Sequence, residues 1–125
     1  MNLVLVIIGG GIGSLLRYLG QRWVNEFYRH SFPLATFLIN ITGCLLIGVL
    51  HALGEKGNIL SSQTRLLLIT GFCGGFTTFS TFAFENMNLL RTGDNLYFIL
   101  YAAGSVVFGT AAVYLGNWFI KLVYA

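Results

Sequence analysis

The sequence predicts an all-α membrane protein with four transmembrane helices in a single domain, 1–125. Hydrophobic residues make up 56% of the 125 residues and charged residues only 9%. A soluble domain of this length cannot bury that much apolar surface. A helix needs roughly 20 apolar residues to cross about 30 Å of hydrocarbon, and four segments meet that length. These segments are 2–23, 33–53, 61–90 and 96–120.

The first expected helix, over 2–23, begins directly after Met1. No basic segment precedes it and no small-residue cleavage site follows it, so it is expected to be a permanent span and not a signal peptide. Gly9 and Gly13 are four residues apart and therefore share one face of this helix. We expect that face to pack closely against another helix, as small residues do in membranes.

The second and fourth expected helices carry polar stripes at helical spacing. In the second, the stripe consists of Thr36, Asn40 and Gly43. In the fourth, every fourth residue belongs to the stripe, which consists of Tyr97, Tyr101, Ser105 and Gly109. Such residues also join helices in membranes, so for any single residue a helix contact and a polar pathway both stay open. Three stripes in one small chain, counting the third span, favour a pathway.

The third expected helix, over 61–90, would be about 45 Å long if continuous, well beyond the hydrocarbon thickness. Ser61 or Ser62 can cap its start. Glycines and threonines gather near its middle: Gly71, Gly74, Gly75, Thr77 and Thr78. Because each glycine lowers helix preference by about 1 kcal/mol, we expect a break there. Unpaired backbone at membrane depth is tolerated where protein buries it or an ion binds it, so the break is a candidate ion site.

Two aromatic residues follow the break. Phe79 and Phe82 are three apart and share a helical face, with Ser80, Thr81 and Glu85 close by. The positive edges of aromatic rings can line a passage for a small anion without a full positive charge that would trap it. Aromatic stripes usually reflect packing alone. The adjacent "GGFTT" and the absence of Lys or Arg at the expected bilayer centre favour a passage here.

Positive charge is balanced between the two expected faces of the membrane. The face with both termini would carry Lys56, Arg65 and Lys121. The other would carry Arg22, Arg29 and Arg91, with Arg17 if its side chain reaches that way. Without the usual cytoplasmic excess of Lys and Arg, the chain is expected to insert in both orientations and to pair as an antiparallel dimer. A single orientation fixed by another feature remains the alternative.

Three stretches carry a resemblance to a known family: "GGGIGSLLRY" (9–18), "FPLATFLINITGCLLIG" (32–48) and "GFCGGFTTFSTFAFE" (71–85). On these motifs the chain resembles the Fluc (CrcB) family of fluoride ion channels over its whole length, the third stretch being the most specific. The resemblance implies a multi-pass protein of the bacterial inner membrane that lets fluoride leave the cell passively, which lowers cytoplasmic fluoride toxicity. It also implies a dual-topology homodimer with two antiparallel pores.

The resemblance implies roles for individual residues. Phe79 and Phe82 would face fluoride, and Asn40 would be the pore carboxamide. The backbone carbonyls of Gly74 and Thr77 would hold a structural, untransported sodium ion on the two-fold axis. Further pathway positions would be Thr36, Ser80, Thr81, Tyr101 and Ser105.

Two charged residues within the spans admit more than one interpretation. Arg17 matches the first-helix arginine of the family and either attracts anions to a vestibule or anchors the helix at the interface, the role favoured here. Glu85 has the same two possible roles. It is also the candidate acid for a different class of protein, a small four-span proton-coupled exporter.

Other function classes fit the sequence less well. A non-transporting assembly subunit is the third class considered. An enzyme is not expected, because no nucleophile, base and orienting group come together and no phosphate-binding loop is present. Cys44 and Cys73 have no metal-ligand spacing, and the short joints between helices leave no room for a nucleic-acid module.

Overall fold

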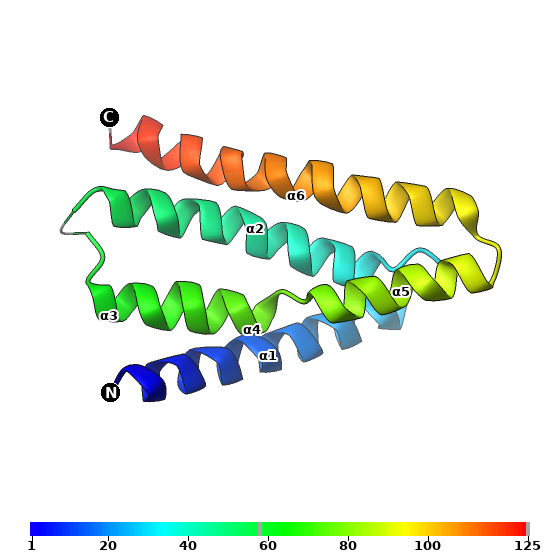
Figure 1. The fold of residues 1–125 in the computed structure, drawn as a ribbon, viewed down its shortest axis with the longest axis horizontal. Coiled ribbons are helices and arrows are strands. Elements are labelled where there is room, and N and C mark those ends of the chain that lie inside the picture. Colours follow the sequence, from blue (N-terminus) through cyan, green and yellow to red (C-terminus); the bar gives the residue numbers. More distant parts are fainter. Residues whose placement is uncertain (58, 125) are drawn as a thin grey trace.

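The computed structural model describes residues 1–57 and 59–124, which fold into helices without a β-strand in that part of the chain. Four helices there are long and apolar enough to cross a membrane, as predicted (Figure 1). Three of the crossings lack a break: α1 (Asn2–Phe27), α2 (Leu34–Glu55) and α6 (Asn95–Val123). The other crossing consists of α3 (Ser62–Arg65), a π-helical stretch η1 (Leu66–Cys73), α4 (Gly74–Phe76) and α5 (Phe79–Arg91).

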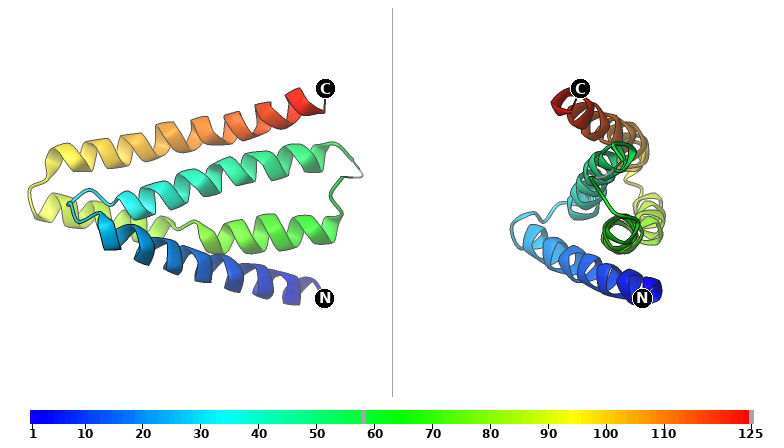
Figure 2. Two further views of the ribbon diagram at one scale, coloured as in Figure 1. Left: turned by 180° about the vertical axis from the view of Figure 1, so that it is seen from behind. Right: turned by 90° about the vertical axis from the view of Figure 1, so that its left-hand side faces the viewer.

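The helices form an open, curved row and not a closed bundle. Along this row the order is α6, α2, the third span and α1, and both termini lie at the same end (Figures 1 and 2). The main packing partners are α2 with α6, and α1 with η1 and α4. An open row leaves broad apolar faces uncovered, which suits a protein surrounded by lipid or by a second copy.

Glycines set the close approach of α1 to the third span. A Cβ on Gly9 would collide with the Leu67 carbonyl, and one on Gly13 would collide with the carbonyl of Phe72. From the opposite side, a Cβ on Gly75 would collide with the Gly10 carbonyl. The two backbones therefore touch directly, which confirms the close packing predicted from Gly9 and Gly13.

The third span is broken near its middle, as the sequence predicts, but the break falls on the threonines and not on the glycines. Thr77 (φ −86°, ψ 157°) and Thr78 (φ −148°, ψ 124°) are extended, whereas Gly74 and Gly75 remain helical. Gly71 and Gly75 serve close packing against α1 instead. Thr78 starts the next helix, because its hydroxyl accepts a hydrogen bond from the Thr81 N–H at 3.3 Å.

Candidate functional site

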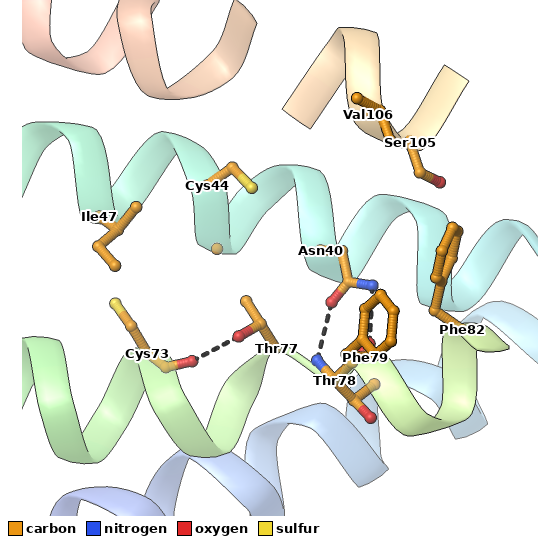
Figure 3. Close-up of a pocket in the computed structure, with 11 residues that line it drawn as sticks. Asn40, Cys44, Ile47, Cys73, Thr77, Thr78, Phe79, Phe82, Ser105 and Val106 are labelled. Carbon is orange, nitrogen blue, oxygen red and sulfur yellow. Dashed lines mark hydrogen bonds between the residues drawn. The ribbon is translucent and has the colours of Figure 1, made fainter. Parts of the chain in front are cut away.

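A pocket of about 320 Å³ opens beside the break (Figure 3). Its walls come from α2, from the two sides of the break and from α6. Five of the residues to which the resemblance assigns a role line it: Asn40, Thr77, Phe79, Phe82 and Ser105. Within the described residues its lining contains no Asp, Glu, Lys or Arg, so the pocket is walled by hydroxyls, a carboxamide, thiols and apolar groups.

Asn40 stabilises the break through two hydrogen bonds to the backbone of Thr78. Its Oδ1 accepts from the Thr78 N–H at 3.0 Å, and its Nδ2 donates to the Thr78 carbonyl at 3.2 Å (Figure 3). One side chain therefore satisfies both backbone groups of a residue that has left the helix. A carboxamide has two N–H donors, so Asn40 keeps one for a ligand in the pocket.

The break also releases backbone carbonyls, among them those of Gly74 and Thr77. In an uninterrupted helix the Thr78 N–H would donate to the Gly74 carbonyl, but it donates to Asn40. Likewise, the Thr81 N–H would donate to the Thr77 carbonyl, but it donates to the Thr78 hydroxyl. The carbonyls of Gly74 and Thr77 thus lose their helical donors, and these are the two carbonyls that the resemblance assigns to sodium.

Arg17 lies against the break. Its Nε donates to the Gly75 carbonyl at 3.1 Å, and the Ser14 hydroxyl donates weakly to the same oxygen at 3.5 Å. The sequence did not predict this contact, and the expected anchoring at the membrane interface stays a prediction. The physical reason for the contact is the glycine packing of α1 on the third span, which brings Arg17 within reach of the last turn of α4.

Three aromatic rings form a row that begins in the pocket lining with Phe79 and Phe82 and continues behind it with Tyr101. The centroids of Phe79 and Phe82 are 5.8 Å apart with an interplanar angle of 45°, and those of Phe82 and Tyr101 are 4.9 Å apart at 54°. Phe79 has 78% of its surface exposed. Its ring therefore presents an edge and a face to whatever covers the pocket.

Ser105 contributes a hydroxyl with no partner. Its Oγ is buried and makes no hydrogen bond to the described residues, although it lines the pocket. Figure 3 shows this hydroxyl pointing toward the side of the pocket where Phe82 lies. A buried hydroxyl without a partner costs free energy. A ligand that accepts a hydrogen bond from this hydroxyl would recover that cost.

Two other predicted pathway residues lie behind the pocket wall. Tyr101 is fully buried, and its hydroxyl donates to Glu85 Oε1 at 2.9 Å. Thr36 is also fully buried, and its Oγ1 accepts from Gln21 Nε2 at 3.2 Å. Glu85 faces a second pocket of about 310 Å³ with a polar lining, between the α1–α2 and α5–α6 joints. The predicted residues therefore form two groups, one in the lining of the first pocket and one behind it. The adjacent rings of Phe82 and Tyr101 join the two groups.

Ser80 and Thr81 lie outside the first pocket. Ser80 is exposed, and the Thr81 hydroxyl accepts from the Thr78 hydroxyl at 3.2 Å. Sequence reasoning missed the central position of Thr78 and the contribution of Gln21. Thr78 stands directly before the apolar residue Phe79, as an N-cap threonine does, which is a sequence signal for a helix start at the break. Gln21 is an uncharged polar residue inside an apolar span.

Comparisons with known proteins give a consistent result. The family described as "CrcB-like protein, Camphor Resistance (CrcB)" matches residues 4–117. The chain is 47% identical to a protein of Chlorobium phaeobacteroides named fluoride-specific ion channel FluC, covering 95% of this chain and 92% of the relative. A Leptospira interrogans protein of the same name is 42% identical, with 96% and 94% covered. A Rhodococcus jostii protein named fluoride-specific ion channel FluC 2 is 48% identical, with 93% and 96% covered.

Proposed function

Because the chain belongs to the CrcB-like protein family, we propose that it is a fluoride-selective ion channel through which fluoride leaves the cell passively. The chain is a multi-pass bacterial membrane protein, and as a member of a family of ion channels it is not an enzyme. Passive efflux through such a pore would lower the fluoride concentration of the cytoplasm and so its toxicity.

The observation that carries this proposal is the buried, unpartnered hydroxyl of Ser105 in an uncharged pocket. Fluoride is small and strongly hydrated, so a dry pore must replace its water with hydrogen-bond donors. Ser105 offers one donor and the second N–H of Asn40 offers another. The edges of Phe79 and Phe82 add a weak positive potential without a cation that would hold the anion.

The proposal includes an antiparallel, dual-topology homodimer whose two-fold axis passes near the break. Gly74 is exposed and a Cβ built there meets no atom within 4 Å, so this side of the break is open to a second copy. The balanced charge of the two membrane faces favours both orientations. Light scattering is expected to give the mass of two chains, and a tag on one terminus is expected to be accessible from both sides of the membrane. A monomer, or one-sided labelling, would contradict this part.

The proposal also includes one sodium ion on that axis, structural and not transported. Two antiparallel copies would bring together four freed carbonyls, two each from Gly74 and Thr77. Carbonyl dipoles that face one another at low dielectric repel unless a cation lies between them, and oxygen ligands suit a hard ion. Among the described residues no three His, Cys, Asp or Glu side chains gather as a metal site, so this ion would depend on backbone oxygens.

Fluoride efflux from proteoliposomes tests the main proposal. A fluoride electrode is expected to record rapid efflux, while chloride loaded in parallel vesicles stays inside because the pocket walls exclude the larger ion. Empty liposomes provide the baseline. Fluoride efflux at that baseline would overturn the proposal, and equal chloride efflux would overturn its selectivity.

Sodium depletion tests the structural ion. Replacing sodium on both sides by a bulky organic cation is expected to reduce fluoride efflux, and a sodium tracer is expected to remain in the vesicles during fluoride efflux. Undiminished efflux after prolonged depletion would remove the ion from the proposal. Sodium movement coupled to fluoride would make the protein a cotransporter.

A proton-coupled exporter predicts a different response at Glu85, whose Oε1 accepts from Tyr101. Glu85→Gln keeps an acceptor for that hydroxyl but cannot exchange a proton. In a channel, an imposed pH gradient with the membrane potential clamped leaves fluoride flux unchanged, in wild type and in Glu85→Gln alike. A proton-driven flux that disappears in Glu85→Gln would support the exporter instead.

A further inference from the structure

We propose that Arg17 is a positioning residue for the cation site: it binds the Gly75 carbonyl and thereby keeps this oxygen away from an axial cation that the carbonyls of Gly74 and Thr77 would hold. This inference rests on the sodium ion of the proposed function. It assigns Arg17 neither to the membrane interface nor to the attraction of anions.

The geometry of the break supplies the first argument. The first helical part of the third span ends at Phe76, and its last turn leaves carbonyls without their usual donors. The Gly75 carbonyl is one of them, and it receives the Arg17 Nε–H at 3.1 Å. A guanidinium at a helix C-terminus also interacts favourably with the negative end of the helix dipole. Arg17 therefore acts as a C-cap supplied by a different helix.

Packing supplies the second argument. Gly75 lies against the Gly10 backbone, with no space for a side chain between the two helices. Gly74, its neighbour, faces the other way and is exposed. The two adjacent residues thus have different environments: the Gly75 carbonyl is held by α1, whereas Gly74 is open to a second copy. Arg17 fixes the rotation of the turn that produces this difference.

Charge supplies the third argument. A cation at the Gly75 carbonyl would stand beside the guanidinium and be repelled. Arg17 therefore excludes a second, off-axis cation from the Gly75 oxygen. The substitution Arg17→Lys would retain the charge and allow one donor to reach a carbonyl, but an ammonium lacks the planar geometry of the guanidinium.

The test compares Arg17→Met, Arg17→Lys and the matched control Arg22→Met. Arg22 is on the same helix and exposed, so its replacement removes the same charge without touching the break. Two quantities are measured on purified protein: the sodium concentration that gives half of the full thermal stabilisation, and amide hydrogen exchange over residues 71–81. The second measurement reports the order of the break whether or not an ion binds.

Arg17→Met is expected to need about tenfold more sodium, the size of effect expected for one charge-assisted hydrogen bond, and to exchange faster over 71–81. Arg17→Lys is expected to fall between wild type and Arg17→Met, and Arg22→Met to match wild type in both measurements. Arg17→Met indistinguishable from wild type would overturn the proposal. Tighter sodium binding in Arg17→Met would also overturn it, because Arg17 would then only repel the ion.

Failure of the proposed function gives a different pattern. If sodium stabilises neither wild type nor any variant, the structural ion is wrong and the cation role of Arg17 falls with it. Hydrogen exchange then still decides whether Arg17 holds the break. Fluoride efflux of wild type, measured separately, tests the channel itself.

Discussion

The two sides of the break in the third span differ in how their polar groups and space are used. On the α1 side, glycine backbones touch and the Gly75 carbonyl is occupied by Arg17 and Ser14. On the α2 and α6 side there is a pocket of about 320 Å³ that contains a buried hydroxyl without a partner in the described chain. On the first side, contacts within one chain fill the space and satisfy the Gly75 carbonyl. On the second side, the space is open and a hydrogen-bond donor lacks an acceptor among the described residues.

This difference separates residues that hold the fold from residues that can serve an ion. A close-packed side tolerates no added volume, so substitutions there should change the free energy of unfolding. On the pocket side, which has an unsatisfied donor, substitutions should change the free energy of unfolding little and should change the rate of fluoride efflux. Asn40 has both roles, because it makes two hydrogen bonds to the backbone of Thr78 and also lines the pocket.

The largest effect is expected for Asn40→Asp. A carboxylate would lose the donor to the Thr78 carbonyl and place a negative charge in the path of an anion. Fluoride efflux should fall by about 100-fold or more, equivalent to about 2.7 kcal/mol in the barrier. Dimer yield should remain measurable by size-exclusion chromatography. Asn117→Asp, away from the pocket on α6, is the matched control, and unchanged flux in Asn40→Asp would remove Asn40 from the pore.

Gly75→Ala tests the closed side. The added Cβ would collide with the Gly10 carbonyl, so the free energy of unfolding should fall by about 1–3 kcal/mol, as overpacking usually costs. Gly11→Ala is the control, because Gly11 is exposed on α1 and a Cβ there meets no atom within 4 Å. Thermal unfolding of the two variants in detergent provides the measurement. If Gly11→Ala is as damaging as Gly75→Ala, the collision with the Gly10 carbonyl is not the cause of the loss.

Phe79→Ile and Phe82→Ile test the aromatic wall of the open side. Losing the ring edge should slow fluoride by about tenfold in each, at the upper end of what an aromatic contact contributes. Phe98→Ile, on α6 and outside the pocket lining, is expected to leave efflux unchanged. Equal losses at all three positions would mean that the rings serve packing and not conduction.

The smallest effect is expected for Ser105→Ala. Removing one donor should slow fluoride efflux by about fivefold, equivalent to a hydrogen bond of about 1 kcal/mol. Thermal stability should stay the same or rise, since the variant also removes a buried hydroxyl that has no partner among the described residues. This opposite response of flux and stability distinguishes an ion-binding hydroxyl from a structural one. A fall in stability with normal efflux would contradict the assignment.

Much of the fold could be predicted because hydrocarbon thickness limits the possibilities. The four spans follow from length and apolarity, and the break follows from a third span too long to cross in one piece. Packing of α1 through Gly9 and Gly13 followed from their spacing. The position of the break within "GGFTT" did not, because glycine is both a helix breaker and a packing residue.

The sequence by itself determined the membrane location, the number of membrane crossings and the stretch that contains the break, since these depend on composition and on local spacing. Only the tertiary structure decided which polar atoms are already occupied. Asn40 meets Thr78 across 38 residues of chain, and Arg17 meets Gly75 across 58. Helical spacing specifies the face on which a side chain lies but not the backbone group opposite it. That pairing depends on how two helices are rotated and translated against each other, which here is set by glycine contacts between their backbones.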